Sequence, residues 1–117
     1  MDRWSVYKTC TIERKRKMNQ IHQYIIQKVG TEEVLSQLME ECAELAQATS
    51  KLRRCINGKN PTPVSRKQAA HNVMEEFAVV AVCLQLLGIS VQQGQVQKIM
   101  EEKTERWAKR LEEADND

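Results

Sequence analysis

Glycine, proline and aromatic residues are scarce in this sequence. The 117 residues include four glycines, two prolines and only 4% aromatic residues. So few turn-forming residues argue against a fold made of many short strands. Alanine and the aliphatic residues are common instead, together with the helix-favouring Glu, Gln, Lys and Arg. The composition therefore predicts an all-α protein, and the length is that of a single domain, residues 1–117, with one core.

Zinc motifs, long apolar runs and a large net charge are also missing. The four cysteines include no C-x-x-C pair and no zinc-binding spacing, which predicts reduced thiols. The longest apolar run is too short to cross a membrane and there is no signal peptide, so we expect a cytoplasmic protein without a membrane partner. The net charge of +2 argues neither for nor against nucleic acid, which is not among the partners we expect.

Four helices are predicted from apolar residues that recur every three or four positions. Gly30 and Gly88 end the first and third helices, and Thr31, Ser65 and Ser90 begin the other three as N-caps. Both serines precede a glutamine by three residues, which matches the capping box. The predicted helices cover residues 11 or 12 to 28, 31 to about 56, 65 to 87, and 90 to about 113.

The segments outside these helices are short. Residues 57–64 contain Asn-Gly and two prolines and form the one convincing loop. Residues 1–10 have no period and are expected to form a loosely held arm, and residues 114–117 to fray at the other end. The basic residues 14–17 are interpreted as the solvated start of a helix, with a nucleic-acid contact as the alternative. Three β-branched valines near position 80 also allow a strand there, but capping and length favour a helix.

Two pairs of adjacent glutamates stand inside apolar helical patterns, at residues 40–41 and 75–76. Glu41 and Glu44 are three residues apart and therefore point the same way on a helix. Projection places the apolar arc of this helix at residues 35, 38, 42, 45 and 49, with Glu41 at its edge. Glu76 instead falls within the apolar face of the third helix. A carboxylate there must be protonated, paired with a Lys or Arg, or bound to a metal.

The two glutamate segments resemble the signatures of a known enzyme family. Glu40-Glu41-Cys42-Ala43-Glu44-Leu45 resembles the E-E-x-x-E-L signature of the MazG-like, all-α nucleoside triphosphate pyrophosphohydrolases. Glu75-Glu76-Phe77-Ala78-Val79 resembles the second signature, E-E-x-x-D. The likeness in order, spacing and helical context extends over roughly residues 18–112. It implies a MazG-like bundle of four to five helices that is completed by oligomerisation, as a homodimer or homotetramer.

The resemblance also implies a function and a set of site residues. The family hydrolyses a nucleoside triphosphate to the monophosphate and pyrophosphate with Mg²⁺, or with Mn²⁺ in its place. Glu41, Glu44 and Glu76 would be the metal ligands, and Glu41 or Glu44 would also activate the attacking water. Lys103 resembles the family's catalytic, phosphate-binding lysine on the last helix. Arg106 and Arg110 would join Lys103 in binding the substrate.

The resemblance breaks at position 79, where the family has aspartate and this chain has valine. Valine cannot coordinate magnesium, so three carboxylates would remain and the metal site would be weakened. One alternative is a non-catalytic helical module that binds a nucleotide or a partner protein. Another is a purely structural bundle whose basic N-terminal segment contacts nucleic acid. The sequence does not identify the base or sugar of the nucleotide.

Overall fold

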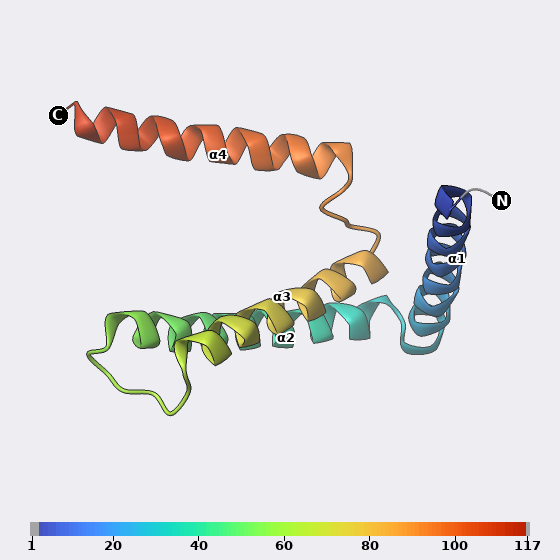
Figure 1. Ribbon diagram of the computed structural model, residues 1–117, viewed down its shortest axis with the longest axis horizontal. Coiled ribbons are helices and arrows are strands. Elements are labelled where there is room, and N and C mark those ends of the chain that lie inside the picture. The colour runs from blue at the N-terminus through green and yellow to red at the C-terminus, as the bar shows by residue number, and fades with distance from the viewer. Residues whose placement is uncertain (1–2, 117) are drawn as a thin grey trace.

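The computed structural model describes residues 3–116, with side chains described from residue 11 onward. In that part of the chain it contains four helices and no strand (Figure 1). The all-α prediction is therefore confirmed, and the valine-rich segment is helical. The helices are α1 (Arg3–Val29), α2 (Thr31–Asn57), α3 (Arg66–Leu86) and α4 (Gly94–Asp115).

Glycine and serine positions predicted most of the helix ends correctly. Gly30 separates α1 from α2 with φ 87°, and Gly88 follows α3 with φ 81°, a left-handed conformation that side chains other than glycine rarely adopt. Ser65 caps α3, because its side-chain oxygen accepts a hydrogen bond from the Gln68 backbone N–H at 3.1 Å. Thr31 was the wrong cap: Gly30 occupies the N-cap position and Thr31 is already helical.

Two helix starts differ from the prediction. α1 begins at Arg3, so the helical backbone includes most of the segment expected to be an arm, which contains no glycine or proline to interrupt it. α4 begins at Gly94, not at Ser90. The Ser90 hydroxyl instead accepts a bond from the Gln92 backbone N–H at 3.2 Å, and Gln93 Nε2 donates to the Gly88 carbonyl at 2.7 Å. Residues 87–93 therefore form a second connection that sequence patterns missed.

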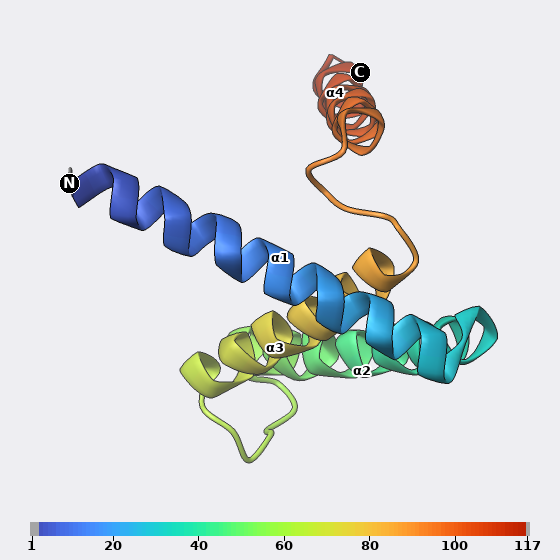
Figure 2. The ribbon, with the colours of Figure 1, turned by 90° about the vertical axis from the view of Figure 1, so that its right-hand side faces the viewer.

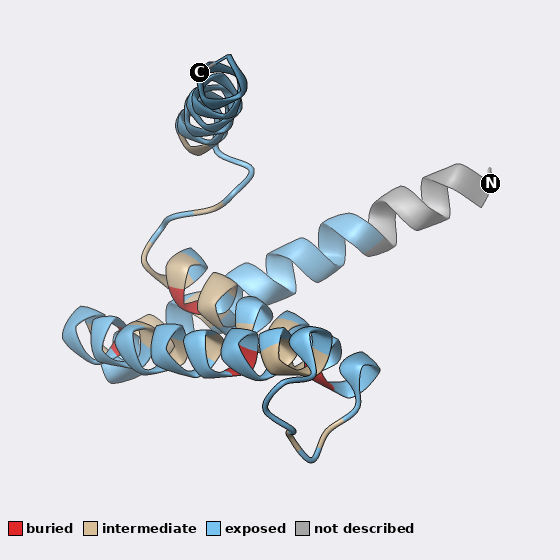
Figure 3. Ribbon diagram, turned by 90° about the vertical axis from the view of Figure 1, so that its left-hand side faces the viewer, coloured by how far each residue is buried: buried red, intermediate tan, exposed pale blue. Residues whose placement is uncertain are grey.

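Helices α2 and α3 form an antiparallel pair that contains every buried residue among those described (Figures 1 and 3). Val34 and Ala48 of α2 are buried, as are Ala69 and Cys83 of α3. Within each helix the two buried residues are fourteen positions apart, which is two heptads along one face.

The face of α2 that packs on α3 is rotated from the predicted arc. Val34, Leu38, Glu41, Leu45 and Ala48 are buried or half-buried on this face. The predicted members at positions 35, 42 and 49 are exposed instead. Glu41 therefore lies within the packed face and not at its edge. A second apolar stripe of α2, formed by Leu35, Met39 and Cys42, is exposed, and Met39 is 74% exposed.

The remaining helices leave much of their apolar surface uncovered. α1 crosses the α2–α3 pair near one end, and α4 stands apart from it in both ribbon views (Figures 1 and 2). The Cα radius of gyration is 19.3 Å, whereas a compact domain of this length has about 13 Å. The accessible surface is 10236 Å², compared with about 6,500 Å² for a compact monomer of this mass. Trp107 of α4 and Phe77 of α3 are more than half exposed.

Helix α3 is also long enough and apolar enough to cross a membrane by length and composition, contrary to the expectation from the sequence. A core helix of a soluble protein passes the same test, so this property alone does not place the chain in or out of a membrane.

Candidate functional site

Glu41 and Glu76 face each other across the α2–α3 pair. Glu41 lies seven residues from each of the buried residues Val34 and Ala48, and Glu76 lies seven from each of Ala69 and Cys83. Both glutamates are half-buried. They thus occupy the layer between two apolar layers of the core, where hydrophobic side chains would be expected. Gln37 Nε2 donates a hydrogen bond to Glu41 Oε1 at 2.8 Å and holds that carboxylate in place.

The surroundings of the Glu76 carboxylate disfavour its negatively charged form. Its Oε2 is buried and has no hydrogen-bond partner. A hydrogen bond with Glu41 raises the pKa of Glu76 above its ordinary value of 4.5, and burial and the negative charges of Glu41, Glu44 and Glu75 raise it further. When both facing carboxylates are ionised, neither has a proton to share with the other. Either a proton or a cation is needed to stabilise this pair.

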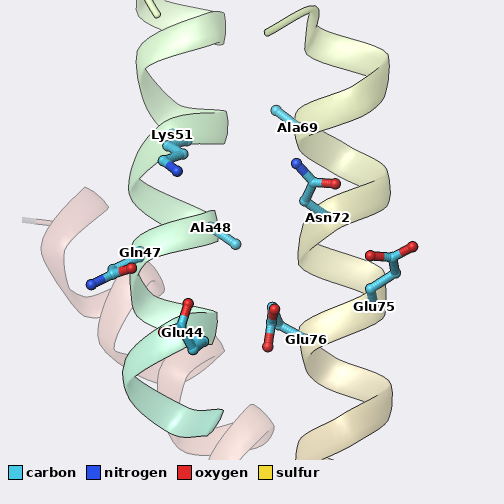
Figure 4. Close-up of a pocket in the computed structure, with 8 residues that line it drawn as sticks. All are labelled: Glu44, Gln47, Ala48, Lys51, Ala69, Asn72, Glu75 and Glu76. Atoms are coloured by element: carbon cyan, nitrogen blue, oxygen red, sulfur yellow. The ribbon is translucent and has the colours of Figure 1, made fainter. Parts of the chain in front are cut away.

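A small cavity of about 170 Å³ adjoins Glu76. Its carboxylates come from both helices, with Glu44 on α2 and Glu75 and Glu76 on α3. Figure 4 shows Glu76 and Asn72 reaching from α3 toward α2, whereas Glu75 lies on the side of α3 that faces away. Glu75 Oε1 is instead 2.9 Å from His71 Nε2 on the outer surface.

The structure therefore brings Glu41, Glu44 and Glu76 close together, and the charges of Glu41 and Glu44 raise the pKa of Glu76. In the part of the chain that is described, no three His, Cys, Asp or Glu side chains stand in an arrangement that could hold a metal ion as placed. The only ion pair among those residues is His71–Glu75, so Glu76 has no Lys or Arg partner within 4.0 Å. Within the part of the chain whose side chains are described, no basic residue neutralises Glu76.

The predicted phosphate-binding residues are not near the glutamates within one chain. Lys103, Arg106 and Arg110 lie on α4, where every residue after Val96 is exposed, and α4 packs against none of the other helices. Val79 is 40% exposed, one turn after Glu76 on α3, and does not line the cavity.

Lys51 and Asn72 are cavity residues that the sequence reasoning did not single out. Both follow from heptad spacing once the packed faces are known. Lys51 is seven residues after Glu44, and Asn72 is four before Glu76, so each lies on the same helix face as its glutamate. The exposed Gln47 also lines the cavity but points away from α3 in Figure 4.

The described cysteines are free thiols, as predicted, and Cys10 lies outside the described side chains. Burial raises the pKa of the Cys83 thiol, with Glu41 and Cys42 adding to the effect. Cys55 Sγ donates to the Val64 carbonyl at 3.4 Å and ties the connection between α2 and α3 to the end of α2.

Comparison with protein-family models, with curated proteins and with solved structures found no match to this chain.

We expect the contribution of Glu76 to the stability of the metal-free protein to fall as pH rises. The folded state raises the pKa of Glu76, so the stability it contributes is complete below about pH 4.5 and is lost as pH increases through the raised value. A Glu76→Gln variant keeps the shape without the charge and should lose less. Thermal unfolding is measured from pH 4 to 8 in the presence of a chelator. The melting temperature of the variant should rise relative to that of the parent protein as pH increases. The same gain for Glu102→Gln on α4 would contradict this account.

Proposed function

We propose that the chain is a magnesium-dependent nucleoside triphosphate pyrophosphohydrolase of the MazG-like type, active in the cytoplasm and weakened by Val79. The observation that supports this most is the Glu41–Glu76 pair. Two facing carboxylates within the packed faces of a helix pair destabilise the fold unless a bound proton or cation compensates their charge. The order and spacing of Glu41, Glu44 and Glu76 resemble those of three of the family's metal ligands.

The donor set suits a hard divalent cation. Glu76 Oε2 is a buried oxygen without a donor, and Glu41 and Glu44 are close enough to affect its titration. Oxygen-only ligands are those that Mg²⁺ prefers, and Mn²⁺ accepts the same set. Glu41, Glu44 and Glu76 would hold the ion, which when bound neutralises the triphosphate and polarises the phosphorus that is attacked.

The chain's own residues would perform the remaining steps. Water attacks the phosphorus at the α–β linkage, and Glu41 or Glu44 accepts its proton. The bond to the β-phosphate breaks, and the products are a nucleoside monophosphate and pyrophosphate. The hydrogen bond from Gln37 holds Glu41 in one orientation for this role. Lys103, Arg106 and Arg110 would offset negative charge on the leaving pyrophosphate.

A homodimer or homotetramer belongs to this proposal. One chain exposes roughly 3,700 Å² more than a compact monomer would, and obligate interfaces bury about 2,000–5,000 Å² in total. Self-association would cover the apolar stripes of α2, α3 and α4. It also offers a route by which α4 of one copy reaches the glutamates of another.

Light scattering coupled to size exclusion should therefore give two or four times the 13.5 kDa chain mass. Replacing the exposed Trp107 with Glu should shift that mass toward the monomer, because a charge cannot be buried unpaired in an apolar interface. Lys109→Glu, which also changes α4 but not its apolar residues, serves as the control. A monomeric parent protein would contradict the assembly.

The second candidate function is binding of a nucleotide without turnover, which Val79 favours because it removes one expected ligand. Calorimetry with several triphosphates, with and without magnesium, separates the two. Binding without release of pyrophosphate supports the binding module, and turnover supports the enzyme. The main test is a panel of canonical and damaged nucleoside triphosphates assayed for pyrophosphate release, with this chain and with its Val79→Asp form.

A further inference from the structure

The middle of the sequence concentrates positive charge. Between Leu45 and Met74 there is no Asp or Glu, although the chain contains 16 of them. The same segment has six of the 18 Lys and Arg residues, so the rest of the chain is net acidic. The six are Lys51, Arg53, Arg54, Lys59, Arg66 and Lys67.

The fold gathers these six residues at one end of the α2–α3 pair, which we call the basic end. Three lie in the last two turns of α2, one in the connection at residues 58–65, and two in the first turn of α3 (Figure 1). Five of the six are exposed. None forms an ion pair among the described residues. Arg54 is half-buried, and its Nε has no hydrogen-bond partner.

Helix stability explains only part of this arrangement. Cations near the C-terminus of α2 are favoured by the helix dipole. Arg66 and Lys67 lie in the first turn of α3, where the same dipole disfavours cations and where no acidic residue is present. Mutual repulsion of six unpaired cations adds to the cost. An anionic partner would remove both penalties.

Lys51 connects the basic end to the cavity beside the glutamates. It lines that cavity together with Glu44 and Glu76. In Figure 4 Lys51 and Ala69 lie at one end of the cavity, toward the connection between the helices, and Glu44 and Glu76 lie at the other. The cavity therefore runs from carboxylates at one end to one cation, Lys51, at the other.

The geometry points to a binding site for linked phosphates at the basic end, with Lys51 as its innermost contact. A nucleotide whose α-phosphate lies beside the glutamates would extend its β- and γ-phosphates past Lys51 toward Arg66 and Lys67. That orientation rests on the proposed function, but the affinity of the basic end for linked phosphates does not. Flexible ammonium and guanidinium groups are the usual partners of such oxygens.

Titration calorimetry with inorganic tripolyphosphate in a chelator-containing buffer tests this site without any metal or turnover. The parent chain should bind, and the affinity should fall with added salt because exposed charges are screened. Lys51→Gln/Arg66→Gln/Lys67→Gln should bind roughly tenfold more weakly or worse, the usual effect of losing one charged hydrogen bond. Lys28→Gln/Lys98→Gln/Lys109→Gln removes the same charge elsewhere and should change the affinity little.

The outcomes separate this inference from the proposed function. Equal losses in both triple variants, or no binding by the parent chain, would overturn the site. Tighter binding of a single-stranded oligonucleotide than of tripolyphosphate would also overturn it, in favour of a nucleic-acid surface. Thermal unfolding checks that the variants fold, and the single Lys51→Gln variant repeats the test with the smallest perturbation. Turnover by the Val79→Asp form with a KM that Lys51→Gln leaves unchanged would keep the enzyme and exclude the orientation that places the substrate's phosphates past Lys51.

Discussion

The Val79→Asp substitution is expected to raise magnesium-dependent release of pyrophosphate on the order of 10- to 100-fold, the range over which groups at a metal site typically change affinity or activity. Position 79 is one helical turn from Glu76, so an aspartate there would share its side of α3. Val79 is 40% exposed, and a carboxylate at that position would stay hydrated. The rate of pyrophosphate release at saturating magnesium is the measurement.

Two controls define what the gain means. Val79→Asn has nearly the shape of aspartate without its charge, and should recover only a small part of the activity. Val79→Ala removes the branched side chain and adds no ligand, so it should recover none. If Val79→Asp increases neither turnover nor magnesium affinity, residue 79 is not a metal-ligand position and the likeness to the second signature has no functional meaning.

The Glu76→Gln substitution is expected to separate stability from activity. In the metal-free protein at neutral pH it should raise the melting temperature, because it removes a charge from a site where the hydrogen bond with Glu41, burial and three neighbouring carboxylates raise the pKa of Glu76. In the Val79→Asp background it should lower turnover by about 100-fold or more, since a metal-bound transition state loses several kcal/mol of stabilisation. Magnesium should raise the melting temperature of the Val79→Asp protein but not of Val79→Asp/Glu76→Gln.

Glu102→Gln on α4 provides the matched control, since it removes the same charge from an exposed helix face. It should change neither the melting temperature nor the turnover by much. A Glu76→Gln protein that melts lower than the parent and keeps its turnover would reverse both expectations. Glu76 would then be a structural residue, and the facing pair would have no catalytic meaning.

The pattern of apolar residues in α2 does not determine which face of the helix packs on α3. The predicted arc contained Leu35, Leu38, Cys42 and Leu45, of which Leu38 and Leu45 are half-buried and Leu35 and Cys42 are exposed. Hydrophobicity alone does not tell which side of such an arc is covered. Packing against α3 buries the side that carries Val34 and Ala48. Glu41 therefore lies within the packed face and not at the edge of the apolar arc.

The N-terminal boundaries of α1 and α4 show a different limit. No glycine or proline precedes Thr11, so α1 can begin as early as Arg3, although no periodic pattern of apolar residues predicts a helix there. At Ser90 the capping pattern is present, but the hydroxyl accepts a bond within a turn that lies before the actual N-cap, Gln93, three residues further along the chain. Local side-chain bonds that compete with the helix decide such cases, and they depend on backbone conformation.

By itself the sequence determined that the chain is helical, where two glycines and one serine delimit the helices, and that Glu76 lies on an apolar face. These are local properties, set by side-chain spacing and backbone conformational preference. Only the tertiary structure decided that Glu41 faces Glu76, that Lys51 and Asn72 share a cavity with Glu44 and Glu76, and that Lys103 does not line it. Those relations join residues far apart in the chain, and the packing of α2 on α3 selects among faces that look alike in one dimension.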